Sequence, residues 1–572
     1  MRLTTAASLL ALLVAAGPAG AQATGRGSAV SSSGDREPND AATTRDEPGR
    51  GDRSNAQPGG SRRAARAEEA KLSDAEIATA PIQERRVETR HSGVFGGRTL
   101  AYNATAGTVT IRDDDGKPTA SMFYVAYTAG GDGRNSGRPV TFFYNGGPGS
   151  SSMWLHMGSL APMRVRTDSP ASTANAPFQL VPNGDSLLDK SDLVFIDAIG
   201  AGFSRPLGDT KLQALWGTDP DIDAFARGIE RWLTINDRWN APKFLFGESY
   251  GTTRSAGLSY RLAQDGAQLN GVVLLSSILN YGRRSPGFDQ EMINYLPTYA
   301  ATAAYHHRLQ AQPADVMTLV QQVRDWARGP YALALAQGQA LPDDQRQAIA
   351  TQMAAFIGLS PRFILDSDLR VEPSAFRKEL LRDQRRTLGR YDARFTGIDV
   401  GAAGDSPEYD PSDTGITGAF VSSFHHYLTH DLHYDTDLTY RPTYYSQSLR
   451  WSFDHRAPGS RGGGPTNMAD VALDLSAAMR ENPNLKVYSL NGIYDMATPF
   501  FGTEYDLAHM QIDRSLMPNL RFAYYPSGHM VYLNVDALRT MHADLARFYD
   551  EAAPGAGSMA TPGRQGKPRR RG

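Results

Sequence analysis

Residues 244–258 read FLFGESYGTTRSAGL, in which a short apolar run ends at a serine that lies between two glycines. The apolar run is typical of a buried strand, and residues 252–264 are typical of a helix. In a G-x-S-x-G sequence with this context, the serine lies on a sharp, strained turn, and close packing requires glycine on both sides. The positive N-terminal end of the helix would point at Ser249. The stretch therefore predicts an α/β fold that exposes Ser249 as a nucleophile.

Other short apolar runs continue the same pattern along the chain. They lie at 139–147, 191–200, 271–277, 485–490 and 520–525, and helical segments are expected at 221–237 and 536–549. Alternation of this kind predicts a mostly parallel central sheet that is covered by helices. Residues 85–128 instead predict N-terminal antiparallel strands, with a hairpin turn at the DDDG sequence. The alternation stops for about 200 residues, which predicts a large, largely helical cap insertion at about 284–478.

The two ends of the chain have a different composition. Residues 1–23 combine one arginine, an apolar run and a small-x-small end, which predicts a signal peptide that is cleaved after Ala23. Export to the periplasm or the medium would follow. We expect a disordered linker at 24–75, the catalytic domain at 76–552 and a disordered basic tail at 553–572. After signal cleavage, no segment is expected to be integral to a membrane.

The overall composition narrows the classes of partner and cofactor. The chain has 572 residues and a net charge of −2, so nothing in its charge balance indicates a nucleic-acid partner. It has no cysteine, which excludes disulfides and thiolate zinc sites. No phosphate loop or dinucleotide fingerprint occurs, and we expect no cofactor. Oligomeric state stays open.

A serine nucleophile needs a base, and the base needs an acid that orients it. Asp495 lies just beyond the apolar run 485–490, and His529 lies just beyond the run 520–525. In α/β-hydrolases the order along the chain is Ser, Asp, His, and each residue follows a strand. The sequence therefore predicts a catalytic triad of Ser249, Asp495 and His529.

Residues 142–163 read FFYNGGPGSSSMWLHMGSLAPM and form the most distinctive stretch of the chain. An apolar strand ends at Asn145, and the glycines and proline that follow would expose backbone N–H groups. Such groups close to a nucleophile are what an oxyanion hole requires. The alternative is a tight loop without a chemical role.

Taken together, NGGPGSSS, DAIGAGFSRP, GESYG, the Asp495 loop and GHMV resemble the serine carboxypeptidase family of α/β-hydrolases. The resemblance covers roughly residues 85–285 and 480–550, and parts of the insertion resemble bacterial members. It implies an α/β-hydrolase fold and the following roles: Ser249 as nucleophile, His529 as general base and then acid, Asp495 as its orienting partner, the amides of Gly147 and Tyr250 as the oxyanion hole, and Asn145 and Glu248 as binders of the substrate's terminal carboxylate.

The position of Glu248 beside the nucleophile suggests a carboxyl group that keeps its proton. A protonated Glu248 can donate a hydrogen bond to a carboxylate, and partial burial raises the pKa of such a group. The alternative is that Glu248 only complements the positive end of the helix. Where the family commonly has a second Glu, this chain has Ser159, so strict exopeptidase preference stays open. Ser150 replaces the family's usual cysteine.

Histidines in the insertion were the other candidates for a site. The segment SSFHHYLTHDLHYD contains His425, His426, His430 and His433, and a helix would place His426 and His430 on one face. The segment lacks the intervening glutamate of a metalloprotease, so we expect no metal and interpret it as a polar face of the cap. For His306 and His307 a place in the substrate pocket and a helix end stay equally open.

These residues predict a serine-type carboxypeptidase that releases C-terminal amino acids from peptides with a free C-terminus, through an acyl-enzyme. Two alternatives remain: an esterase or acyltransferase that uses the same triad, and a binding protein without turnover. The side-chain preference is not predicted, because the insertion forms part of the substrate pocket.

Overall fold

The computed structural model describes residues 80–129, 137–285, 287–445, 449–460 and 465–556. The signal peptide, most of the linker and nearly all of the basic tail that the sequence predicts lie outside these residues. In the part of the chain that the structure describes, no helix is both long and apolar enough to cross a membrane.

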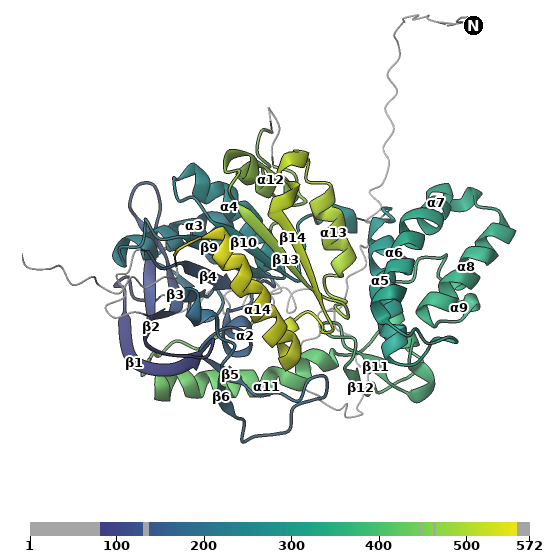
Figure 1. Ribbon diagram of the computed structural model, residues 1–572, viewed down its shortest axis with the longest axis horizontal. Helices are drawn as coiled ribbons and strands as arrows, with labels where there is room; N and C mark the ends of the chain where they lie inside the picture. The colour runs from purple at the N-terminus through teal and green to yellow at the C-terminus, as the bar shows by residue number, and fades with distance from the viewer. Residues whose placement is uncertain (1–79, 130–136, 286, 446–448, 461–464, 557–572) are drawn as a thin grey trace, which may run out of the picture. The chain divides into compact units, whose positions relative to one another are not determined.

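A ten-stranded sheet forms the centre of the fold (Figure 1). Its order is β1-β2-β3-β7-β4-β9-β10-β13-β14, and β8 (Arg205–Pro206) pairs with β3. The strands are β1 (Arg86–Phe95), β2 (Arg98–Arg112), β3 (Pro118–Ala129), β7 (Asp192–Ile196), β4 (Val140–Tyr144), β9 (Lys243–Glu248), β10 (Gly271–Leu275), β13 (Lys486–Gly492) and β14 (Leu520–Tyr525). The first three pair antiparallel with each other and β3 pairs antiparallel with β7, whereas all pairs from β7 to β14 are parallel. The predicted mostly parallel sheet with N-terminal antiparallel strands is confirmed.

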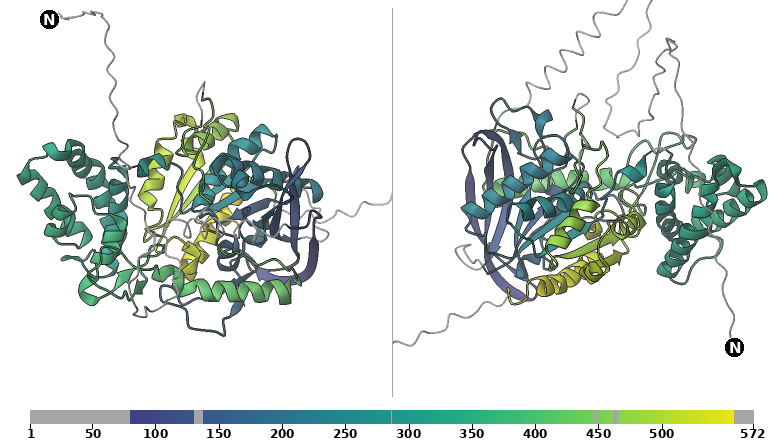
Figure 2. Two further views of the ribbon diagram at one scale, coloured as in Figure 1. Left: turned by 180° about the vertical axis from the view of Figure 1, so that it is seen from behind. Right: turned by 90° about the horizontal axis from the view of Figure 1, so that it is seen from above.

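Helices cover both faces of this sheet (Figures 1 and 2). On one face, Phe143 and Phe246 pack in a cluster with residues of α14 (Val535–Ala552) and α2 (Met153–Gly158). On the other face, Phe142 and Leu245 pack with α3 (Thr218–Ile235), α4 (Tyr250–Gln264) and α12 (Ala472–Glu481). Successive strand residues face opposite sides, and a strand buried on both sides must be apolar throughout. This is why the central strands appear in the sequence as unbroken apolar runs.

Between β10 and β13 the chain forms two different packing units. The first contains α5 (Gln290–Tyr305), α6 (Val316–Trp326), α7 (Ala332–Gln337), α8 (Asp343–Ile357), α9 (Pro361–Asp366) and α10 (Pro373–Glu379). These helices share a separate apolar cluster, which reaches the sheet domain through Phe500 and Phe501 of α13 (Phe500–Ala508). The second unit is α11 (Pro411–His426), whose Ile416, Phe420 and Phe424 pack in the same cluster as α2 and α14. The insertion is therefore helical, as predicted, but α11 belongs to the layer beside the sheet.

The chain from 439 to 456, apart from 446–448, runs across the loops that follow β4 and β7. Thr443 pairs with Ser150, and Arg441 pairs with Gly202, through isolated antiparallel bridges.

At the end of this segment, the His455 ring contacts two carboxylates from separate helices: Nδ1 lies 2.6 Å from Asp219 and Nε2 lies 2.8 Å from Asp474. Burial alone would lower the pKa of His455, but hydrogen bonds to the two carboxylates raise it to about 9.

The contacts of His455 with Asp219 and Asp474 make the free energy of unfolding depend on pH in the alkaline range. Because the pKa of His455 is higher in the folded state than its ordinary value of 6.5, its contribution is fully present below pH 6.5 and is lost as pH rises through about 9. We expect the loss to be about 2 kcal/mol after allowing for the exposure of Asp219. Urea unfolding of the wild type at pH 6 and pH 9.5 measures it, and His455→Gln should remove this component of the pH dependence. An unchanged pH dependence in that variant would contradict the assignment.

Candidate active site

Ser249 lies on a strained turn between the end of β9 and the start of α4. Its φ is 61° and its ψ is −131°, a left-handed backbone conformation that costs a non-glycine residue about 1–3 kcal/mol. The Ser249 N–H donates to the carbonyl of Leu275 on the neighbouring strand at 3.0 Å, which holds the turn in place. Glu248 and Tyr250 on either side are 1% exposed, whereas Ser249 is only partly buried. The turn therefore presents the serine and hides its neighbours.

Two glycines at this site, Gly247 in the turn and Gly146 in the loop after β4, are required because the backbone approaches itself closely there. A Cβ added to Gly247 would lie 2.1 Å from the carbonyl oxygen of Gly251. A Cβ added to Gly146, in the loop after β4, would lie 2.3 Å from the amide nitrogen of Tyr250. Contacts of this length do not occur between real atoms, so a side chain at Gly247 would disrupt the turn itself, and one at Gly146 would push the loop after β4 away from the turn. The second contact also places the loop after β4 directly against the nucleophile turn.

His529 and Asp495 form a buried pair at the same edge of the sheet. They follow β14 and β13, and His529 Nδ1 lies 2.7 Å from Asp495 Oδ2. Burial alone would lower the pKa of His529, but the Asp495 carboxylate raises it above its ordinary value. Asp495 is itself held by the backbone N–H groups of Ala497 (2.7 Å) and Thr498 (3.0 Å), which donate to Oδ1. A carboxylate fixed in this way orients the imidazole and favours its protonated form.

Three further residues hold the histidine, and none of them stood out in the sequence. The Thr498 hydroxyl lies 2.8 Å from Asp495 Oδ2 and 3.1 Å from His529 Nδ1. The Ser276 hydroxyl donates to the His529 carbonyl at 2.6 Å, and the His529 N–H donates to the carbonyl of Tyr391 at 2.6 Å. Serine, threonine and tyrosine are too common for their types alone to have identified them. Only the position of Thr498, three residues after Asp495 in the loop that follows β13, gave any signal.

The residue next to Ser249, Glu248, lies close to the pair formed by His529 and Asp495. In the described part of the chain, no hydrogen bond joins the Ser249 hydroxyl to His529, and such bonds often tighten only when substrate binds. Glu248 is close enough to both members of the pair for their charges to change its pKa. The charge of His529 lowers the pKa of Glu248, and the charge of Asp495 raises it. The three predicted triad residues therefore lie at one edge of the sheet, and the reach between Ser249 and His529 remains a prediction.

The loop after β4 offers two backbone N–H groups beside Ser249. Gly147 N donates no hydrogen bond among those of the described loops, and Tyr250, the first residue of α4, has no acceptor within its helix. Arg254 of α4 donates to the Asn145 carbonyl at 2.8 Å while its Nε forms an ion pair with Asp221 at 2.7 Å. A buried ion pair on the nucleophile's own helix thus fixes the start of this loop. The arrangement suits an oxyanion hole, and its use as one remains a prediction.

The predicted carboxylate-binding residues form a buried polar group with Tyr532. Burial raises the pKa of Glu248 to about 7, despite opposing contributions from His529, Tyr532 and Asn145. Asn145 Oδ1 accepts a hydrogen bond from Leu155 N at 2.9 Å, so its amide N–H groups point elsewhere. Glu248 Oε2 and the Tyr532 hydroxyl are buried without a hydrogen-bond partner among the described residues. Tyr532 is a member of this group that the sequence analysis missed.

Ser159 does not extend this group. It is fully buried, and its hydroxyl donates to the carbonyl of Leu155 at 2.5 Å within α2. A hydroxyl whose only proton is used in this way has none to donate to a substrate. The position that often holds a second glutamate in the family therefore has a structural role in this chain.

Within the described residues, the histidines of the insertion form no metal site. The rings of His426 and His430 are tilted with their centroids 4.4 Å apart, and no group of three His, Cys, Asp or Glu side chains in the described ranges could hold a metal ion. His306 Nε2 contacts the carbonyl of Ala393 at 2.7 Å. His307 follows with a φ of 55°, just after the end of α5. His306 and His307 therefore lie at the C-terminal end of α5.

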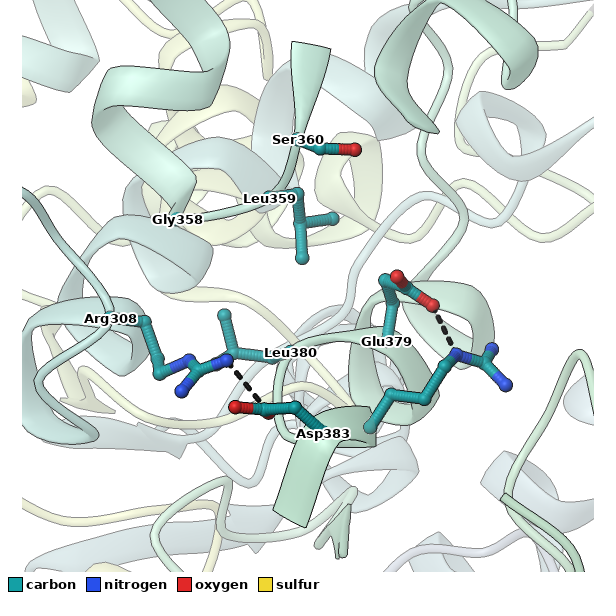
Figure 3. A pocket seen from close by; sticks show the side chains of 8 residues that line it. Arg308, Gly358, Leu359, Ser360, Glu379, Leu380 and Asp383 are labelled. Atoms are coloured by element: carbon teal, nitrogen blue, oxygen red, sulfur yellow. Dashed lines mark hydrogen bonds and ion pairs between the residues drawn. The ribbon is translucent and has the colours of Figure 1, made fainter. Parts of the chain in front are cut away.

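A pocket of about 350 Å³ lies in the insertion, away from the triad residues (Figure 3). Its charged side chains neutralise one another: Arg308 forms an ion pair with Asp383 at 2.7 Å, and Arg382 forms one with Glu379. Because both cations already have a carboxylate partner, this pocket offers a charged ligand no unpaired group.

The chain is similar to one known family and to several solved structures. Residues 97–293 match the family described as serine carboxypeptidase, which confirms the resemblance predicted from the sequence. Among solved structures, a prohormone-processing carboxypeptidase from Saccharomyces cerevisiae is 16% identical, with 78% of this chain and 91% of that chain covered and a TM-score of 0.44. A proline iminopeptidase from Mycobacterium smegmatis is 14% identical, with 78% and 98% covered and a TM-score of 0.32. The sheet topology and the strand–turn–helix at Ser249 are those of the α/β-hydrolase fold.

The hydroxyl of Thr498 can be tested as a positioning group. Thr498→Val keeps the shape and the backbone N–H that holds Asp495 but removes the hydroxyl from the carboxylate and the imidazole. We expect turnover to fall about tenfold, with an unchanged melting temperature relative to Thr503→Val. Thr503 is the matched control, because it is also buried and its hydroxyl donates to the carbonyl of Ser277, as the Thr498 hydroxyl does to that of Ser276. Equal turnover in the two variants would remove Thr498 from the positioning network.

Proposed function

We propose that this chain, as a relative of the serine carboxypeptidases, removes the C-terminal residue of peptides through an acyl-enzyme. The observation that carries the proposal is the buried Glu248, with its pKa near 7 and an unpartnered oxygen, beside the half-buried Ser249. A nucleophile for general hydrolysis has no need of a protonated carboxyl group at this position. A nucleophile for substrates that end in a carboxylate does, because the carboxyl proton can form a hydrogen bond with that end.

In the proposed mechanism, Ser249 Oγ attacks the last peptide carbonyl while His529 Nε2 accepts its proton. Asp495 stabilises the imidazolium that results, and the N–H groups of Gly147 and Tyr250 receive the negative charge on the carbonyl oxygen. Collapse of the tetrahedral intermediate breaks the peptide bond, and His529 gives its proton to the departing amine. Water, activated by His529, then releases the peptide from Ser249.

The terminal carboxylate would be bound by Asn145 and Glu248, with the Tyr532 hydroxyl next to them. Asn145 has its amide oxygen engaged by Leu155 N and therefore donates from Nδ2. Glu248 donates only in its protonated form. Because the group has one acidic carboxyl and Ser159 adds no donor, we expect weaker discrimination for free C-termini than two acidic residues would give.

One observation favours an esterase or acyltransferase as the second candidate. Ser159 is committed to α2, so the carboxylate-binding group has fewer donors, while the triad is indifferent to the leaving group. Blocked dipeptides as free acids and as C-terminal amides distinguish the two functions. A carboxypeptidase cleaves the free acid much faster, whereas an esterase shows no such preference.

We also propose that the enzyme works after export, which N-terminal sequencing of the mature protein tests.

The nucleophile can be tested directly with a fluorophosphonate, which modifies only an activated serine. The wild type should be labelled at Ser249, and Ser249→Ala should lose both labelling and turnover by at least about 10³-fold, because no other residue forms the acyl-enzyme. Ser255→Ala is the matched control on the same helix, since its hydroxyl contacts Tyr144 instead. Labelling that persists in Ser249→Ala, or a wild type that is not labelled, would contradict the proposal.

Glu248 predicts a specific pH dependence. A peptide's terminal carboxylate is ionised above about pH 4, and the pKa of Glu248 is about 7. The protonated, donating form is therefore present below pH 7 and is lost as pH rises. We expect kcat/KM for the free-acid dipeptide, divided by kcat/KM for an ester substrate without a free carboxylate, to fall about tenfold between pH 6 and pH 8 in the wild type, because the ratio cancels the titration of His529.

The variant Glu248→Gln separates this effect from the titration of the base. Glutamine donates a hydrogen bond at every pH, so the alkaline fall should shrink to about twofold or less. An ester substrate that lacks a free carboxylate is the control, and it should show no Glu248-dependent fall in either protein. The same alkaline fall in the wild type and in Glu248→Gln would sink the assignment of Glu248 as a proton-dependent donor.

A further inference from the structure

A loop of the insertion, residues 389–395, is fixed between the two loops that carry Asp495 and His529. Its Arg390 carbonyl accepts a hydrogen bond from Met496 N at 3.0 Å, and its Ala393 N–H donates to the Tyr494 carbonyl at 3.0 Å. On the other side, the Tyr391 carbonyl accepts from His529 N at 2.6 Å. Side chains on this loop therefore have defined positions relative to the catalytic pair.

The side chain of Arg390 lies near the imidazole. Its guanidinium carbon is 5.5 Å from the ring centroid of Tyr391, and that ring is 5.2 Å from the ring of His529. The charge of Arg390 also lowers the pKa of His529, which agrees with their proximity. Arg390 is only partly buried, so a ligand can reach it.

Unlike three buried arginines of the fold, Arg390 has no carboxylate partner. Arg254, Arg283 and Arg394 each form an ion pair with an aspartate, at 2.6–3.0 Å. Among the described residues, the Arg390 guanidinium has neither an ion pair nor a hydrogen bond. Partial burial of an unpaired cation is unfavourable, so an anion that binds there gains a partner already freed of much of its water.

The charged groups around Arg390 do not neutralise it by contact. Asp410 is near enough to raise its pKa, but the Asp410 oxygens accept hydrogen bonds from backbone and side-chain groups of Arg390, Tyr391 and Ser412. Arg284 adds a second positive charge nearby, and it is paired with Glu291. The remaining neighbours are Tyr295, Tyr391 and Tyr445, which Arg390 affects electrostatically.

We infer that Arg390 binds a carboxylate of the substrate beside the scissile bond and so makes the enzyme selective for an acidic group there. The inference rests on the proposed function. A guanidinium can grip a carboxylate with two parallel N–H donors. The carboxylate is either the peptide's own terminus or an aspartate or glutamate side chain next to the bond that is cleaved. In both cases the insertion adds a cationic contact to the donors of Asn145 and Glu248, where Ser159 of the sheet domain adds none.

The test measures binding without turnover. In a Ser249→Ala background, calorimetry gives the Kd of blocked dipeptides in three matched pairs: Glu against Gln at the C-terminal residue, Glu against Gln at the residue before it, and free acid against amide at the C-terminus. We expect the carboxylate member of at least one pair to bind about 10- to 100-fold more tightly. Adding Arg390→Gln should bring that ratio close to one, and Arg390→Lys should retain part of it.

Arg386→Gln is the matched control, since it removes an exposed charge from the same insertion. Three results would overturn the inference: ratios unchanged by Arg390→Gln, an equal loss for both members of every pair, or the same change in Arg386→Gln. The proposed function is tested separately, by turnover of the same dipeptides by the enzyme with Ser249 intact. Carboxylate binding that depends on Arg390 in a protein without turnover would support this inference and refute the function.

Discussion

The site depends on the close approach of two backbone segments, the loop after β4 and the turn at Ser249. This contact is possible only because Gly146 lacks a side chain, and it brings the amides of the first segment against Ser249, the predicted nucleophile, in the second. The hydrogen bond from Ser249 N to Leu275 O and the ion pair between Arg254 and Asp221 hold the two segments in that position. The parallel strands β4, β9, β13 and β14 then bring the remaining residues to the same edge.

The insertion does more than cover this edge. Its loop at 389–395 makes backbone hydrogen bonds to the loops of both Asp495 and His529, so the geometry of this proposed acid–base pair is set partly from outside the sheet domain. Arg394 strengthens this attachment through Asp392 and the carbonyl of Pro526. Changes in the insertion that shift this loop would therefore alter catalysis and substrate choice together.

The sequence predicted the sheet because buried parallel strands must be apolar throughout, and it predicted the strand ends because each closes in a glycine or a polar residue. It predicted Ser249 as a candidate because the serine lies between two glycines after a strand, and Asp495 and His529 because they follow two later strands in the order Ser, Asp, His. Contacts between distant, common residues could not be predicted in this way. Tyr391 and Thr498 hold the imidazole, and Tyr532 lies beside Glu248, yet a tyrosine or a threonine at these positions has no distinctive local pattern.

The placement of α11 was equally hidden in the sequence. Its apolar residues would suit packing against the insertion helices as well as packing against α2, and only the tertiary structure decides between these partners. The role of Ser159 depended on the direction of one hydroxyl, which α2 determines. In both cases the missing information is the identity of the neighbour, since local sequence sets only the character of a surface.

The order of the candidate residues along the chain has a consequence for synthesis. Ser249 is made well before the predicted acid Asp495, the predicted base His529 and the helix α14. On the proposed triad, a nascent polypeptide therefore carries a hydroxyl with no group to activate it until residue 529 has been made and folded into place. Copies that stop before this residue would have the serine but not the activity.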